Sequence, residues 1–324
     1  MIRACLAMAL ALLLPQVHAV AAQQACDRAC LYGLTDQWLE AVQAHSSAAL
    51  PLAKGFRYTE NGVEMPAGEG LFQTVTGYTR YRARAADLRA GEVAVIGEAI
   101  EGEKAVTFAT RLKVVGRAIA EAETVIGRSF ATVHPSMPTT ARPGLQTIVP
   151  KQARISRKAM IATVQRNFDN LLKNDGSHFA DDCQRIENRM PMSGNPQLRY
   201  PIAPIEGKPV PPFGSMGCRA QVEAHLFDTL DRVDPRRILV IDEEQQLVFG
   251  VFSLRFYGRT ECNDIPGYGR TCPARPRGPM SLLSAEMLGV RGGKIHEVEV
   301  IFTRVGYDAG QGWPAEKREA GAGR

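Results

Sequence analysis

The chain has 324 residues, of which 45% are hydrophobic and 23% are charged, and its formal net charge is +5. This length favours two domains, and the scattered lysines and arginines do not form the basic stripe of a nucleic-acid-binding protein. No glycine-rich phosphate-binding motif follows a strand pattern and no His-Glu-x-x-His sequence occurs, so we predict no cofactor and no metal site.

The first residues predict a signal peptide over residues 1–22. Arg3 precedes an apolar run over residues 4–14, and small residues follow it, which is the order of a secretion signal. The run is much shorter than the roughly 20 residues that span a bilayer. A buried N-terminal helix is the alternative interpretation. We therefore expect an exported protein, periplasmic or secreted, without a membrane span.

The cysteines support cleavage, because loss of Cys5 leaves an even number, six. In an oxidising compartment an even set indicates disulfides. Zinc binding is disfavoured, because the close Cys-x-x-Cys spacing and partnering histidines are missing. Cys26 and Cys30 are open to a local bridge, a bond to another chain, or reduced thiols. Two pairs each bracket a loop rich in proline and glycine, and we expect both to close: Cys183–Cys218 and Cys262–Cys272.

Two segments with helical spacing open two similar stretches of sequence. Behind each helix comes a segment that contains Glu-Asn, residues 55–65 and residues 182–192, and these align on that dipeptide. A second pair of alternating segments, 105–117 and 247–259, ends in Gly-Arg in both cases and predicts long strands. The helical positions that form the apolar stripes are Leu31, Leu34, Trp38 and Val42, and later Met160, Ile161, Val164, Phe168, Leu171 and Leu172.

These two pairs of similar segments predict tandem copies of one domain. The proposed boundaries are a first domain over 23–132, a linker over 133–153 that contains His134, a second domain over 154–308 and a flexible tail over 309–324. One copy would hold a working cavity and the other would support it, and the richer polar set favours the second copy.

The helix, the strand with Arg, Glu and Asn, and the long strands that follow resemble the nuclear transport factor 2-like superfamily. The second copy also looks like an uncharacterised exported domain of fungi and bacteria. The resemblance implies an α+β fold of two tandem cone-shaped domains, each a curved antiparallel sheet packed on helices. Relatives include ketosteroid isomerase, scytalone dehydratase, limonene-epoxide hydrolase and polyketide cyclases, so it also implies cofactor-free acid–base chemistry in the cone.

Candidate site residues come from polar groups near these strands. A base needs a carboxylate or histidine, and an oxyanion needs a hydrogen-bond donor. Each residue also has a structural interpretation: a turn cap, a same-face ion pair or a core histidine. The expected catalytic residues are His225, Asp181, Asp182, Arg185, Glu187 and Tyr257. The expected substrate-binding residues are Tyr58, Glu60, Arg255 and Phe252.

The leading hypothesis is therefore an exported lyase, dehydratase or isomerase that needs no cofactor and acts on a small apolar or aromatic molecule. The alternative is a non-catalytic exported protein that binds a small molecule or dimerises; a homodimer is compatible with both. A serine hydrolase is disfavoured, because no Gly-x-Ser-x-Gly sequence occurs. An enzyme predicts a free carboxyl or histidine in an apolar pocket, whereas a binding protein predicts polar groups that pair with one another.

Overall fold

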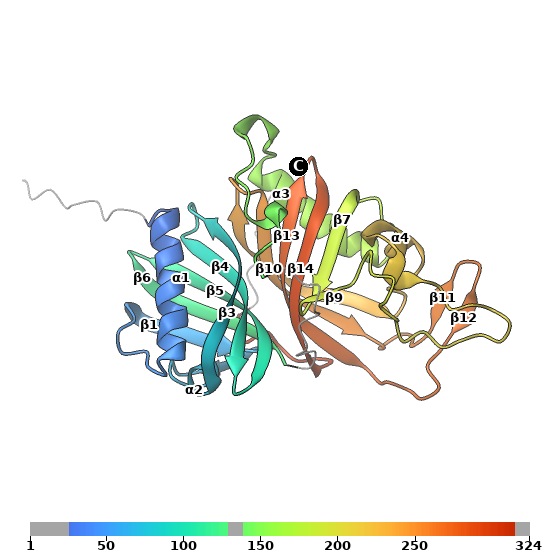
Figure 1. Cartoon of the computed structure of the whole chain (residues 1–324), viewed down its shortest axis with the longest axis horizontal. Coiled ribbons are helices and arrows are strands. Elements are labelled where there is room, and N and C mark those ends of the chain that lie inside the picture. The colour runs from blue at the N-terminus through green and yellow to red at the C-terminus, as the bar shows by residue number, and fades with distance from the viewer. Residues whose placement is uncertain (1–25, 129–138, 315–324) are drawn as a thin grey trace, which may run out of the picture.

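The computed structural model describes residues 26–128 and 139–314 (Figure 1). The predicted signal peptide, Cys5 and His134 lie outside the described residues. Two units of similar build follow one another along the chain. We call residues 28–127 the first unit and residues 157–306 the second unit.

The first unit is one long helix and a six-stranded sheet of order β2-β1-β6-β5-β4-β3. Helix α1 (Arg28–Gln43) begins after Asp27, whose carboxylate caps it by accepting a hydrogen bond from the backbone N–H of Cys30. The other elements are β1 (Leu52–Glu60), β2 (Val63–Met65), α2 (Leu71–Thr74), β3 (Val75–Asp87), β4 (Glu92–Glu101), β5 (Lys104–Val115) and β6 (Ala118–Gly127).

The second unit repeats this order in its own sheet, β8-β7-β14-β13-β10-β9. Helix α3 (Arg157–Leu171) begins after Ser156, whose hydroxyl accepts from the backbone N–H of Ala159. The other elements are β7 (Phe179–Glu187), β8 (Met190–Pro191), α4 (Cys218–Glu223), β9 (Leu230–Asp242), β10 (Leu247–Phe256), β13 (Met280–Arg291) and β14 (Lys294–Gly306), with a separate hairpin of β11 (Asn263–Ile265) and β12 (Gly269–Thr271).

The predicted fold class, α+β with cone-shaped domains of antiparallel sheet on helices, was wrong. Strands make up 44% and helices 18% of the structure over the described residues, so the protein is mostly β. Both sheets are also mixed, because β1 runs parallel to β6 and β7 runs parallel to β14. Alternating sequence patterns indicate strands but not the relative direction of two strands that are distant in sequence, which is why the pattern did not reveal the mixed sheets.

The Glu-Asn dipeptide that the two units share lies at the same turn in each of them. Asn61 and Asn188 have left-handed backbone conformations, with φ of 49° and 44°. The side-chain oxygen of Asn61 accepts from the backbone N–H of Ile126 at 2.8 Å, and that of Asn188 accepts from the N–H of Phe302 at 2.9 Å. Asparagine tolerates this conformation better than most residues. The same amide therefore ties the hairpin to the last strand of each unit.

The two segments that end in Gly-Arg do not form equivalent strands. Residues 105–117 cover β5, whereas residues 247–259 cover β10. In the common strand order, β5 corresponds to β13, and β10 corresponds to β4. The two segments look alike because both strands are buried on both faces over most of their length and are therefore largely apolar, so the pattern does not distinguish neighbours in the sheet.

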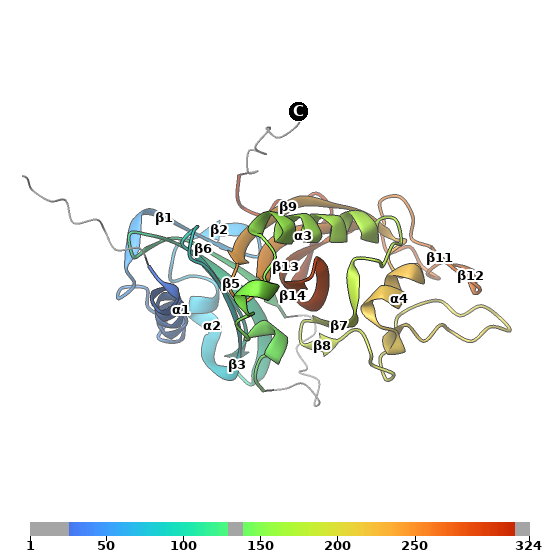
Figure 2. The ribbon, with the colours of Figure 1, turned by 90° about the horizontal axis from the view of Figure 1, so that it is seen from above.

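The two sheets pack face to face, and each carries its own helix on the opposite face, with α1 against β3 and β4 and α3 against β9 and β10 (Figure 2). Small side chains of the first sheet meet larger ones of the second, which lets the sheets approach closely. The buried residues of this contact include Ala83, Ala85, Ala94, Ala109, Leu239, Val240, Leu283 and Met287.

Charged residues cross between the units in a reciprocal way. Arg28 at the start of α1 binds Asp242 at the end of β9, at 2.5 Å. Arg157 at the start of α3 binds Asp87 at the end of β3, at 2.6 Å. Both aspartates are fully buried and also accept a backbone N–H from the other unit. This reciprocity supports the prediction that the two units are copies of one domain.

The end of the described chain lies against the first unit. Trp313 donates its indole N–H to the hydroxyl of Thr59 at 2.9 Å. The guanidinium groups of Arg57, Arg111 and Arg237 lie 4.6, 5.3 and 5.7 Å from its ring centre. Residues 309–314 of the predicted tail are thus held by specific contacts.

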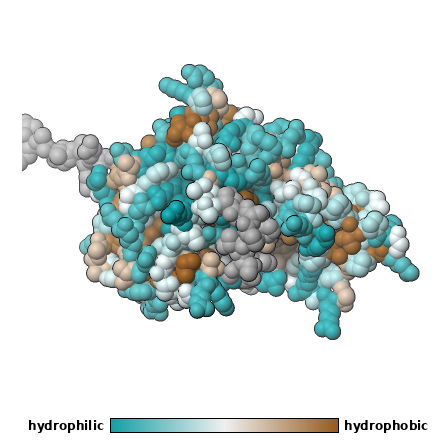
Figure 3. Space-filling model, in the orientation of Figure 1, coloured by the Kyte–Doolittle hydropathy of each residue, from teal (hydrophilic) through white to brown (hydrophobic). Residues whose placement is uncertain are grey.

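Three disulfides are present: Cys26–Cys30, Cys183–Cys218 and Cys262–Cys272. Both predicted pairs are confirmed. Cys26 and Cys30, for which three states were open, form a local bridge. Across the described ranges, no helix is long and apolar enough to span a bilayer. The disulfides are compatible with an exported protein. On the face in Figure 3 apolar residues form small separate patches, which gives a homodimer no particular support there.

Candidate functional site

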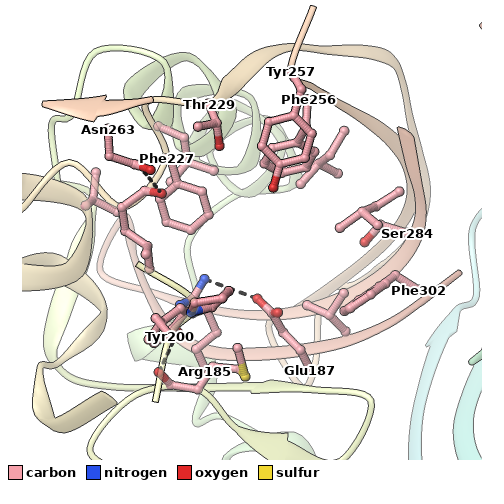
Figure 4. Close-up of a pocket in the computed structure, with 18 of the residues that line it drawn as sticks. Arg185, Glu187, Tyr200, Phe227, Thr229, Phe256, Tyr257, Asn263, Ser284 and Phe302 are labelled. Carbon is pink, nitrogen blue, oxygen red and sulfur yellow. Dashed lines mark hydrogen bonds and ion pairs between the residues drawn. The ribbon is translucent and has the colours of Figure 1, made fainter. Parts of the chain in front are cut away.

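A cavity of about 250 Å³ lies in the second unit, between its sheet and the elements that cover it. Strand alternation explains which side chains reach it. Along β13, Met280, Leu282, Ser284 and Glu286 face the cavity, whereas Leu283, Ala285 and Met287 pack against the first unit. β10 and β14 contribute apolar side chains in the same way: Leu254, Phe256, Val298, Val300 and Phe302. Figure 4 shows the open space at the centre of this lining.

Glu286 is the most unusual group in the cavity. It sits in the middle of a central strand, and only 5% of its surface is exposed. Ser284 donates a hydrogen bond to its Oε1 at 2.8 Å. Ser284 is its one hydrogen-bond partner among the described residues, and the charge of Arg185 acts on Glu286 without forming an ion pair with it. Glu286 is therefore a buried carboxyl group with one oxygen available to a ligand.

The surroundings of Glu286 favour its neutral form. Burial raises the pKa of Glu286 from 4.5 to about 7; the hydrogen bond from Ser284 and the charge of Arg185 oppose this rise, and the charge of Glu187 adds to it. Glu187, Val300 and Glu286 lie opposite one another on three adjacent strands, so one strand separates the two carboxyls. On the other side, Glu286 is opposite Gly250, and the ring of Phe252 leans into the space that a side chain at 250 would fill.

Arg185 and Glu187 share one face of β7, as predicted, and both line the cavity (Figure 4). The Arg185 guanidinium donates to Glu187 at 3.1 Å, and to the hydroxyl of Tyr200 and the side-chain oxygen of Gln221 at 2.7 Å each. It also lies 5.2 Å from the ring centre of Phe227. Arg185 is thus largely committed to partners within the wall, which fits a positioning role better than direct contact with a reacting oxygen.

Tyr257 reaches the cavity after the end of β10, in a left-handed conformation with φ of 65°. Its hydroxyl accepts a hydrogen bond from Arg277 at 2.8 Å, which leaves its own proton available to a ligand. Arg277 also donates to the backbone oxygen of Pro201 at 3.2 Å. This contact joins the two disulfide-bearing loops at the mouth, where Cys218 and Cys272 belong to the lining.

Three of the predicted catalytic residues lie away from the cavity lining. His225 follows α4 rather than lying on it, with φ of 64°, and its ring faces Asp228 at 3.3 Å. Asp181 and Asp182 are exposed on β7 and line a separate, open hollow, where Asp182 pairs with His296 at 2.7 Å. They were selected by closeness in sequence to Arg185, but strand alternation sends Asp182 to the opposite side from Cys183 and Arg185.

Two predicted substrate-binding residues also have structural contacts instead. Arg255 points to the other face of β10, where its guanidinium donates to the backbone oxygens of Asp234 and Tyr307. Phe252 faces the interior of the second unit but lies below the cavity, with its ring centre 4.4 Å from that of Phe168. Phe252 therefore supports the cavity floor without forming part of its lining.

In the first unit the corresponding space is filled. Tyr58 packs its ring 5.3 Å from Trp38 and 6.2 Å from Phe72. Its hydroxyl donates to Glu60 at 3.1 Å, and Glu60 also accepts the backbone N–H of Leu71 at 2.8 Å. Tyr58 and Glu60 are thus core residues that bind one another.

Sequence reasoning missed Glu286, Asn167 and Thr229, which line the cavity. The signal for Glu286 was a single acidic residue inside the apolar run 281–290, preceded by a serine with which it shares a strand face. Asn167 had a comparable signal, because it lies on the buried stripe of α3 between Val164 and Leu171. Within the described ranges, no cluster of three or more histidine, cysteine or acidic side chains is arranged to hold a metal.

Comparisons with known proteins leave the activity open. Residues 153–302 are similar to a family described as "Domain of unknown function (DUF8021)". No curated protein matches the chain. A solved structure of a de novo designed protein with a curved β-sheet is 14% identical, and the match covers 32% of this chain and 90% of that one with a TM-score of 0.25. A likeness of this size supports no conclusion about fold or function.

Proposed function

We propose that the protein is an exported lyase, dehydratase or isomerase that works by acid–base catalysis without a cofactor on a small, largely apolar molecule. The observation that carries the proposal is Glu286, a buried carboxyl with an unpartnered oxygen in an apolar cavity. Export is supported by the three disulfides and by the pattern of the first residues.

Glu286 replaces the residues first expected to act as the base. A catalytic group exchanges protons best when its pKa lies near the working pH, and burial places the pKa of Glu286 at about 7. In its charged form it removes a proton from a carbon next to a carbonyl group. In its neutral form it returns that proton to another atom of the substrate. The hydroxyl of Tyr257 is available to stabilise the negative oxygen that forms between these steps.

The test is a screen of the purified protein against aromatic and polyketide-like alcohols and ketones. We expect Glu286→Gln to lower turnover by about 10²- to 10⁴-fold, the usual contribution of a general base. His225→Ala and Asp182→Asn are the controls and should retain turnover, because neither residue lines the cavity. Full turnover by Glu286→Gln would contradict the proposal.

The binding alternative keeps one specific observation in its favour. Arg185, Glu187, Tyr200 and Gln221 are connected to one another, as expected for a wall that only shapes a ligand site. Binding of compounds from the same screen without turnover of any of them would favour this alternative. The free oxygen of Glu286 is the reason that we rank catalysis first.

A further inference from the structure

We propose that the cavity selects an uncharged ring compound with one hydroxyl group, that the side-chain oxygen of Asn167 accepts a hydrogen bond from this hydroxyl, and that carboxylates are rejected. The inference rests on the proposed function in one respect, which is that the ligand occupies the cavity that contains Glu286. It adds the chemical class of the ligand and a specificity residue.

The shape and lining of the cavity favour a flat apolar molecule. Aromatic side chains come from three sides: Phe227 from the segment before β9, Phe256 from β10 and Phe302 from β14 (Figure 4). Rings that face a ligand from several directions bind another ring through stacked and edge contacts. The volume of about 250 Å³ lies just below the usual range for drug-sized ligands, so a molecule of one or two rings fits.

The charges in the lining disfavour an anion. Both arginines that line the cavity, Arg185 and Arg277, already donate to described residues of the wall or mouth. Three carboxyl groups line it as well: Glu187, Glu261 and Glu286. A bound carboxylate would lose its water and meet these acidic groups, which outnumber the two arginines of the lining.

Asn167 provides the complementary feature, a polar group without a partner. It projects from α3 into the cavity lining and is 4% exposed. Its side-chain oxygen is buried and has no hydrogen-bond partner among the described residues. A buried amide oxygen without a partner costs free energy, and a ligand hydroxyl that donates a hydrogen bond to it removes part of that cost. A site of this kind discriminates strongly against a ligand that lacks the oxygen.

The test compares three probes of nearly equal shape by calorimetric titration at neutral pH: 2-naphthol, 2-methylnaphthalene and 2-naphthoate. We expect 2-naphthol to bind most tightly and 2-naphthoate to bind at least about 100-fold more weakly, the cost of burying a charge without a partner. Asn167→Leu should weaken the binding of 2-naphthol by about three- to tenfold, the net value of one hydrogen bond, and should leave the affinity for 2-methylnaphthalene unchanged.

Asn167→Ala serves as the second variant if the leucine variant does not fold, and it should show the same selective loss. Equal binding of 2-naphthoate and 2-naphthol would overturn the rejection of anions. An equal effect of the substitution on 2-naphthol and 2-methylnaphthalene would overturn the role of Asn167, and failure of every probe to bind would overturn the ligand class. Binding in the expected pattern without turnover of any compound would keep this inference and reject acid–base catalysis.

Discussion

Glu286→Gln should raise the free energy of unfolding by about 3 kcal/mol at about pH 8 and leave it nearly unchanged at about pH 4. The reason is the pKa of Glu286, which burial raises from 4.5 to about 7. The folded protein therefore holds this proton more tightly than the unfolded chain does. The contribution of Glu286 to stability is greatest below pH 4.5, falls as the pH rises towards 7, and is then constant. Glutamine keeps the shape and the contact with Ser284 but never becomes charged.

Urea denaturation of the native chain and the variant at a series of pH values measures this difference in the free energy of unfolding. The contributions of the other titrating groups are the same in both proteins and cancel. Glu103→Gln is the matched control, because Glu103 is exposed at a turn between β4 and β5. Its difference from the native chain should not change with pH. A flat difference for Glu286→Gln would show that this carboxyl has the same pKa in the folded protein as in the unfolded chain.

Arg185→Met should destabilise the protein by about 3–5 kcal/mol, because removal of one partner of a buried ion pair leaves the others without compensation. Arg185 is 7% exposed, and its guanidinium donates hydrogen bonds to Glu187, Tyr200 and Gln221. Methionine keeps the apolar stem and removes only the charged group. Loss of this network should also open the mouth, because Tyr200 belongs to the loop over the cavity.

Arg219→Met is the control for this experiment. Arg219 also pairs with a glutamate, Glu223 at 2.8 Å, but both side chains are 46% exposed. Exposed pairs contribute little to stability, so no measurable change is expected. If Arg185→Met proved as stable as the native chain, the network around Arg185 would not be what holds β7 to the cavity loops.

Local patterns predicted the parts of this protein that depend on local geometry. The pairing of Cys183 with Cys218 and of Cys262 with Cys272 came from the loops that they close. Arg185 and Glu187 were placed on one face because side chains alternate along a strand. The alignment on the Glu-Asn dipeptide paired equivalent positions, because the asparagine has a left-handed backbone conformation and the same kind of hydrogen bond in each unit.

What the sequence left out depends on contacts between distant segments. The parallel pairing of β1 with β6 and of β7 with β14 leaves no mark in either strand's alternation. The sequence 281–290 shows that Glu286 is inside a strand, but only the register with Glu187 and Gly250 shows what surrounds it. The sequence around His225 is that of a helix, but the helix ends at Glu223. His225 itself has a left-handed backbone conformation, and its side chain does not line the cavity.

The most direct test of the central claim is the pKa of Glu286 itself, which requires no knowledge of the substrate. Carbon-13 NMR of protein labelled at the glutamate carboxyls gives this value, and the signal that disappears in Glu286→Gln identifies the residue. We expect a midpoint at about pH 7, where a buried carboxyl exchanges protons readily. A midpoint near the ordinary 4.5 would contradict the account, because Glu286 would then be a charged wall residue rather than an acid–base group.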